Sequence, residues 1–343
     1  MRLRRNCRLG VITVLIAVGV VVLLWGFIRE GAVVLAAAQG VQKDVLQSGP
    51  QIAGCPVFPA DNVWNTPVAS LKRDAHSDAY VQKIGADKPL HPNFGSDPRN
   101  GIPITIIKSS VKYVKVRFGY GDESDPGNYP MPDDPLIEGG ADAPADSDRH
   151  IVMIDESRCM LIELLGAVKQ PDGSWVAASG VKMDLTSNAL RPEGKTSTDA
   201  AGLAILPGLL RYDEVASGEV RHAIRFTAPK TQRAYVWPAR HFASKSEDPN
   251  YPPMGQRFRL RADVDISAYS KENQVILTGL KKYGMILSDN GSPWFIIGAP
   301  DKRWNDEDLS KLKALKGSDF EAVDQSDWQM HADSGRVDPV SLR

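Results

Sequence analysis

The chain has 343 residues, 42% of them hydrophobic, and its 41 Lys and Arg against 42 Asp and Glu give a formal net charge of -1. This near-neutral balance argues against a broad nucleic-acid-binding surface, which draws its affinity from a basic excess, so no nucleic-acid partner is expected. The hydrophobic content predicts a folded protein of one or two domains. Gly and Pro, 29 and 24 in number, are spread between short apolar runs, which is typical of turn-rich β structure.

The N-terminus is predicted to be an export element. Several arginines precede an uncharged apolar stretch, residues 11–28, that is nearly long enough to cross a bilayer core. Because the positive charges stand before this stretch, we expect the rest of the chain outside the cytoplasm. Residues 1–38 are therefore a signal peptide or a membrane anchor. Three alanines at 36–38 offer a cleavage site, and both alternatives stay open.

Three further regions follow the export element. Residues 39–54 are polar and patternless and are expected to form a linker. Residues 55–324 carry the apolar runs and are predicted to form a single globular domain. Residues 325–343 lose apolar periodicity, and we expect a loosely ordered tail there.

Cysteine usage fits export. Cys7 lies in the basic N-terminal region, so only Cys55 and Cys159 follow the apolar stretch. Such a pair in an oxidising compartment predicts one disulfide, with two separate buried thiols as the alternative. Neither cysteine has a second Cys or a His at ligand spacing, and no metal site or cofactor is expected.

The first half of the domain shows the pattern of short strands. Residues 103–120 alternate as a strand pair joined at 108–110, and 150–155 and 159–168 are predicted as the next two strands. Residues 170–175, QPDGSW, have a sequence that is typical of a hairpin loop.

A long loop rich in Asp, Pro and Gly, residues 119–149, lies between these strands. Its order of acids matches no EF-hand loop, which disfavours a calcium site. A loop of this length inside a compact domain often helps to form a binding cleft.

The C-terminal part is predicted to be mixed. Ser270 can cap a helix over 271–283, and Asn305 can cap a second helix over 306–316. Between them, Asn290 and Gly291 predict a hairpin turn within 285–298. The fold class expected is mainly β, a β-sandwich or jelly-roll-like domain with short C-terminal helices. A parallel α/β fold is the alternative.

Several motifs together resemble a group of secreted bacterial proteins of uncharacterised function. The motifs are CPVFPADNVWNTPV, TSTDAAGLAILPGLLRYDEV, RHAIRFT, YVWPARH and PPMGQRFRL. The resemblance implies an exported single-unit protein, and it implies no particular reaction.

A basic and aromatic stretch, residues 211–242, is the strongest candidate for part of an active site. Two strands joined by a turn at 229–231 are predicted in it. Alternation puts His222, with Ile224 and Phe226, on the face opposite Arg225. His222 is then either a buried structural histidine or an acid or base on a cleft floor. Upstream, residues 200–210 are almost wholly apolar and are expected to form a buried connection.

An exported β-rich protein with this composition is expected to act on an extracellular or cell-envelope polysaccharide. A glycoside hydrolase would use paired carboxylates, for which the candidates are Asp199, Asp213 and Glu214. A lyase would use His222 or His241 as base, with Arg225 or Arg240 holding a uronate. Tyr235 and Trp237 could stack on sugar rings.

Two other readings remain. A non-catalytic glycan- or protein-binding envelope module would use the same aromatic and charged residues. A metal enzyme using His150, His222 and His241 is weaker, because these histidines are far apart in the sequence. The enzymatic hypothesis requires His222, Arg240, His241 and Asp199 to meet in one open cleft.

Overall fold

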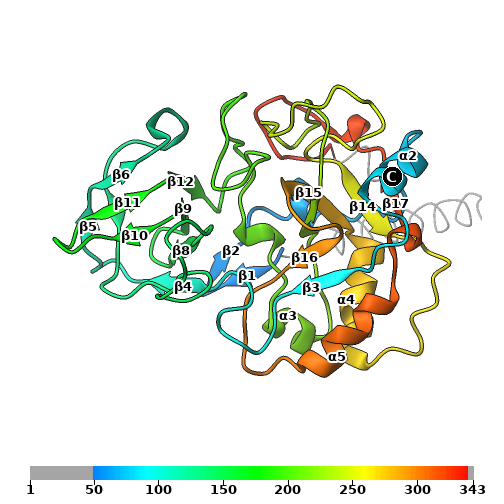
Figure 1. Cartoon of the computed structure of the whole chain (residues 1–343), viewed down its shortest axis with the longest axis horizontal. Coiled ribbons are helices and arrows are strands. Elements are labelled where there is room, and N and C mark those ends of the chain that lie inside the picture. The colour runs from blue at the N-terminus through cyan, green and yellow to red at the C-terminus, as the bar shows by residue number, and fades with distance from the viewer. Residues whose placement is uncertain (1–48, 339–343) are drawn as a thin grey trace, which may run out of the picture. The chain divides into compact units, whose positions relative to one another are not determined.

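The computed structural model describes residues 49–338 (Figure 1). The predicted export element, Cys7 and most of the predicted linker lie outside the described residues. Within residues 49–338 no helix is both long enough and apolar enough to cross a membrane.

The larger of two main sheets has six strands and mixes parallel with antiparallel pairs. In spatial order they are β17 (Phe320–Val323), β14 (Arg257–Leu260), β15 (Met285–Asn290), β13 (Ile224–Ala228), β16 (Phe295–Ile297) and β3 (His91–Asn93). Phe226, Phe258 and Trp294 are fully buried, and their ring centroids lie 5.4 to 5.7 Å apart. This aromatic cluster forms the centre of the main core.

The second main sheet has four strands and lies on the other side of the molecule in Figure 1. Its order is β12 (Ser179–Asp184), β9 (Met160–Leu165), β8 (Ile151–Asp155) and β4 (Ile104–Ile107). β8 is completely buried, because its alternate side chains face two different hydrophobic clusters. The two strands predicted at 150–155 and 159–168 are confirmed as β8 and β9, which pair antiparallel.

Three small sheets complete the strands. They consist of β10 (Val168–Lys169), β11 (Trp175–Ala177) and β6 (Val116–Phe118); β5 (Tyr113–Val114) and β7 (Tyr129–Pro130); and β1 (Gln51–Ile52) and β2 (Cys55–Pro56). β10 and β11 form the hairpin predicted around QPDGSW.

Helices are few and short in the described part. They are α2 (Ser77–Ile84), α3 (Tyr212–Ser217), α4 (Lys271–Lys282) and α5 (Asp306–Ser310). Ser270 Oγ accepts the backbone N–H of Asn273, so the predicted cap of α4 is confirmed. Asn305 likewise caps α5, which is shorter than predicted and continues as a 3₁₀ turn, Lys311–Ala314. The predicted mainly-β fold with short helices is confirmed, and none of the described sheets closes into a barrel.

Three predicted strand pairings are wrong, each because a distant strand takes the partner's place. β15 and β16 are not a hairpin, since β13 lies between them. β4 pairs with β8 and not with β6. Residues 233–239 do not pair with β13 and make only an isolated bridge between Tyr235 and Met254.

The predicted buried connection is confirmed, because residues 201–210 are all buried between the two main sheets. The chain beyond Asp324 differs from the expected loose tail as far as the structure describes it. Trp328 and Val337 are buried in the main core. The segment lacks apolar periodicity in its sequence, so the burial of these two side chains was not predicted.

Candidate functional site

The residues predicted for catalysis and binding are distributed over three places and do not share one open cleft. Glu214, on α3, lies together with His222. Asp199 and Arg225 lie together between the two main sheets. Trp237 and Arg240 hold the C-terminal segment. The convergence that the enzymatic hypothesis required of His222, Arg240, His241 and Asp199 is therefore not found.

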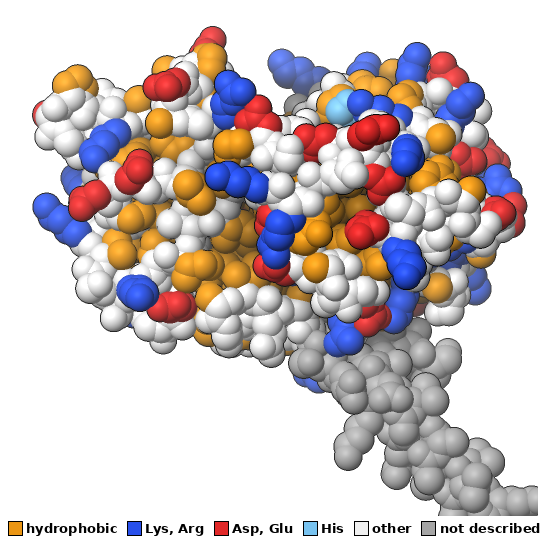
Figure 2. Space-filling view, turned by 90° about the horizontal axis from the view of Figure 1, so that it is seen from below, with side chains coloured by type: hydrophobic (Ala, Val, Ile, Leu, Met, Phe, Trp, Pro, Cys, Tyr) orange, Lys and Arg blue, Asp and Glu red, His pale blue; other side chains and the backbone are white. Residues whose placement is uncertain are grey.

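A groove of about 1310 Å³ runs along the face that carries β4 and α3. Figure 2 views this face and shows hydrophobic side chains across its middle, with charged side chains around them. Ile104, Ile106, Leu136 and Ile137 contribute aliphatic surface, and the long loop at 119–149 supplies part of the wall, as expected. Among the described residues that line the groove there is no aromatic side chain, so it lacks the stacking surface expected for sugar binding.

Glu214 and Asp213 border this groove in different ways. Asp213 is exposed and forms an ion pair of 2.8 Å with Arg303. Glu214 is largely buried and contacts the guanidinium of Arg211 and, at 3.0 Å, Nε2 of His222. Burial would raise the pKa of Glu214, but Arg211 and His222 outweigh it and hold this pKa below its usual value. Glu214 is therefore ionised near neutral pH.

His222 is fully buried. Its Nδ1 lies 2.7 Å from the carbonyl oxygen of Ala223, and its Nε2 faces Glu214. Both ring nitrogens are thus engaged inside the protein, and the imidazole has no surface in the groove. This is the geometry of the structural alternative considered for His222.

Asp199 is buried at the start of the connecting segment. Its Oδ1 accepts the backbone N–H groups of Ala201 (3.0 Å) and Leu203 (3.1 Å). Burial raises the pKa of Asp199 to about 7, against the opposing effect of Arg225. Its other oxygen, Oδ2, lies 3.5 Å from Nη2 of Arg225.

Arg225 is buried too and faces a second carboxylate that sequence reasoning missed. Nη2 of Arg225 lies 4.0 Å from Oδ2 of Asp289, whose side chain is 32% exposed. Burial raises the pKa of Asp289, with Arg225 opposing the shift. The only sequence signal for Asp289 was the motif Asp289-Asn290-Gly291, which we interpreted as a hairpin turn.

Three polar side-chain atoms of Asp199 and Arg225 have no hydrogen-bond partner within residues 49–338. Among the described residues, no hydrogen-bond partner reaches Asp199 Oδ2, Arg225 Nε or Arg225 Nη2, although all three are buried. Buried polar groups are ordinarily satisfied, and unsatisfied ones concentrate at functional sites. We call Asp199, Arg225 and Asp289 the acidic cluster.

The four-stranded sheet supports the acidic cluster from behind. Glu163 on β9 accepts the hydroxyl of Thr198 (2.9 Å) and the backbone N–H groups of Ile205 and Leu206. His150, immediately before β8, places Nε2 2.9 Å from the carbonyl oxygen of Thr198 and Nδ1 2.5 Å from Glu138 Oε2. Thr198 precedes Asp199, so the position of Asp199 depends on both residues.

The remaining predicted binding residues are engaged elsewhere. Trp237 is buried and donates its indole N–H to Ser334, and Arg240 binds the carbonyl oxygen of Ala332 and the carboxylate of Asp333. Tyr235 donates its hydroxyl to Glu193 at 2.7 Å. His241 is half-buried, with Nδ1 3.0 Å from the carbonyl oxygen of Ala200, next to Asp199.

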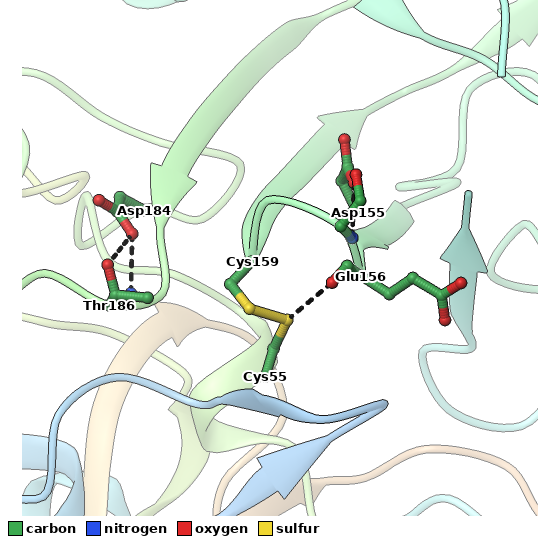
Figure 3. Close-up of a disulfide and its surroundings, with 7 residues drawn as sticks. Cys55, Asp155, Glu156, Cys159, Asp184 and Thr186 are labelled. Carbon is green, nitrogen blue, oxygen red and sulfur yellow. Dashed lines mark hydrogen bonds between the residues drawn. A yellow bond between two sulfur atoms is a disulfide. The ribbon is translucent and has the colours of Figure 1, made fainter. Parts of the chain in front are cut away.

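The predicted disulfide is confirmed and lies outside these sites. Cys55 and Cys159 are bonded, with their Cα atoms 5.3 Å apart, so β2 is joined to the turn between β8 and β9 (Figure 3). Asp155 and Asp184 end their strands beside the bond, and each accepts the backbone N–H of the second residue after it.

Within residues 49–338 no group of three or more His, Cys, Asp or Glu is arranged to hold a metal ion. Comparisons with protein-family models, with curated proteins and with solved structures find no match to this chain.

Proposed function

We propose that this chain is an exported glycoside hydrolase acting on an extracellular or cell-envelope polysaccharide, with Asp199 and Asp289 as its two carboxylates. The observation that carries the proposal is that both face one guanidinium nitrogen, Nη2 of Arg225. Since the two distances are 3.5 and 4.0 Å, the carboxylate oxygens lie within about 7.5 Å of each other, the sum of the two. Glycosidases place their carboxylates about 5 to 9.5 Å apart.

The two carboxylates differ in environment as the two roles require. Asp199, with its pKa raised to about 7 by burial, keeps its proton up to neutral pH and donates it to the leaving glycosidic oxygen. Asp289 is the most exposed member of the acidic cluster, because its side chain is 32% exposed whereas that of Asp199 is fully buried. It either takes a proton from the attacking water or attacks the anomeric carbon itself. Arg225 stabilises whichever carboxylate carries charge.

A hydrolase fits the charges better than a lyase. A lyase acting on uronates needs a cation free to neutralise the substrate carboxylate. Arg225 already faces two carboxylates, and Arg240 is held by Asp333 and two backbone carbonyls. The same balance favours a neutral glycan as substrate, because a uronate would meet the like charge of Asp289, and Arg225 already faces both carboxylates.

A binding module is the second candidate. The aliphatic groove along β4 and α3 favours it, because this surface suits an apolar protein segment and contains none of the residues of the acidic cluster. Under this alternative the protein would bind a partner and release no sugar.

The test is product release from a panel of neutral and acidic glycans by the full-length protein, with Asp199→Asn, Asp289→Asn and the exposed control Asp213→Asn. The proposal expects neutral glycans to be cleaved by the wild type and by Asp213→Asn only. Cleavage that survives in Asp289→Asn would refute the role given to Asp289, and no cleavage of any glycan would favour the binding module.

A further inference from the structure

The contacts of His150 have a consequence for Asp199. His150 is buried, and both of its ring nitrogens face groups that accept hydrogen bonds. The carbonyl oxygen of Thr198 can only accept. Glu138 is a carboxylate whose pKa burial would raise, but the hydrogen bond and charge of His150 hold it below its usual value. A neutral imidazole has one N–H and could satisfy only one of the two.

The surroundings of His150 favour the charged ring. Burial and Arg225 on β13 oppose a positive charge here, whereas Glu138 favours it, and the pKa of His150 is raised overall. Glu163 on β9 and Asp289 on β15 interact electrostatically with the same ring. Carboxylates thus face His150 from three segments, and one cation opposes it.

His150 acts on the catalytic segment through Thr198. Thr198 is held at its hydroxyl by Glu163 and at its carbonyl by His150. The carbonyl carbon of Thr198 is bonded to the nitrogen of Asp199, so fixing this peptide fixes the start of the turn in which Asp199 accepts the N–H groups of Ala201 and Leu203.

We propose that His150 is a positioning residue: as a doubly protonated imidazolium clamped by Glu138, it holds the Thr198–Asp199 peptide so that Asp199 faces Arg225. Loss of its proton breaks one of its two hydrogen bonds and loosens this segment. The assignment of a catalytic purpose rests on the proposed function. The clamp itself does not.

The first experiment reads the protonation of His150 directly. Nitrogen-labelled histidine is incorporated into the full-length protein, and His150→Gln identifies the signal among the six histidines. We expect a doubly protonated ring at neutral pH in the wild type. In Glu138→Gln, which keeps the size of the partner and removes its charge, the ring should be neutral at the same pH. A neutral ring in the wild type would overturn the proposal.

The second experiment reads the position of Asp199 without any substrate. Hydrogen exchange of the Leu203 amide, which donates to Asp199 Oδ1, should be about tenfold faster in His150→Gln, as loss of a hydrogen bond to a charged group implies. His222→Gln is the matched control, because His222 is also buried between a carboxylate and a carbonyl but lies beside α3. Unchanged exchange in His150→Gln, or equal acceleration in the control, would refute the positioning role.

The two proposals can fail separately. If a glycan is cleaved, Glu138→Gln should move the alkaline limb of kcat to lower pH and leave KM unchanged. If no glycan is cleaved, the proposed hydrolase is refuted, whereas the labelling and exchange results still decide whether His150 clamps the segment.

Discussion

Asp289 shares a face with Arg225 because the register between β13 and β15 shifts by one residue after Phe226. Phe226 lies opposite Leu287, but Thr227 lies opposite Asp289, so Ser288 is an extra residue on β15. Side chains alternate along a strand, and a residue gained on one strand turns the following side chains to the other face. Without this bulge Asp289 would point away from Arg225 and the acidic cluster would have one carboxylate.

The first prediction concerns the roles of the two carboxylates. On a cleaved glycan, Asp199→Asn and Asp289→Asn should each lower kcat by about a hundredfold to ten-thousandfold, the usual contribution of a positioned acid or base. Asp213→Asn should retain wild-type kcat, since Asp213 is exposed and pairs with Arg303. Initial rates under saturating substrate measure this. Equal losses in all three variants would point to a general effect of removing negative charge.

The second prediction concerns the disulfide. Cys55 and Cys159 are 104 positions apart, and closing so long a loop restricts the unfolded chain strongly. We expect Cys159→Ser to lower the free energy of unfolding by about 2 to 4 kcal/mol. Denaturant unfolding with and without reductant measures it, and the variant itself should not respond to reductant. A wild type that is equally stable under both conditions would contradict the prediction.

The third prediction separates the two histidines of the 211–242 stretch. His222 is fully buried and bonds Glu214, so His222→Ala leaves a cavity and removes one partner of a buried carboxylate, and it should cost about 2 to 5 kcal/mol. His241→Ala removes one contact of a half-buried ring and should cost under about 1.5 kcal/mol. Thermal unfolding of both variants is the measurement. A larger loss in His241→Ala would reverse our structural assignment.

Local patterns in the sequence predicted much of the fold. The apolar runs of β8 and β9, the cap at Ser270 and the almost wholly apolar stretch at 200–210 were each visible within about a dozen residues. The sequence predicted the acidic cluster only in part. Asp199 and Arg225 could be named as candidates, but their meeting with Asp289 depends on β13 inserting between β15 and β16.

Asp289 was missed for a definite physical reason. Asn290 and Gly291 are the strongest short hairpin signal in the chain, and this local preference predicts a hairpin. In the structure Asn290 is instead the last residue of β15. The partner of each strand is decided by burial of the apolar faces of β13, which no short window contains. The sequence pointed to His150 only as part of a weak metal hypothesis and did not point to Glu138, because both act on Asp199 only through the carbonyl of Thr198.

The last prediction concerns stability against pH. Asp199 titrates near 3.8 in a model peptide and at about 7 in the folded protein, so between these values the folded state binds more protons than the unfolded state. The free energy of unfolding must therefore fall as pH rises through this window, and the raised pKa of Asp289 acts in the same direction. Each unit by which a pKa is raised corresponds to about 1.4 kcal/mol.

Asp199→Asn removes this titration and keeps an oxygen that can accept the N–H groups of Ala201 and Leu203. We expect the variant to lose less stability than the wild type between about pH 4 and pH 7, the two pKa values between which Asp199 gains its charge. Denaturant unfolding at a series of pH values measures the slope, and Asp213→Asn, which alters an exposed carboxylate, should keep the wild-type slope. If Asp199→Asn kept it as well, Asp199 would be ionised throughout this range and could not serve as the proton donor.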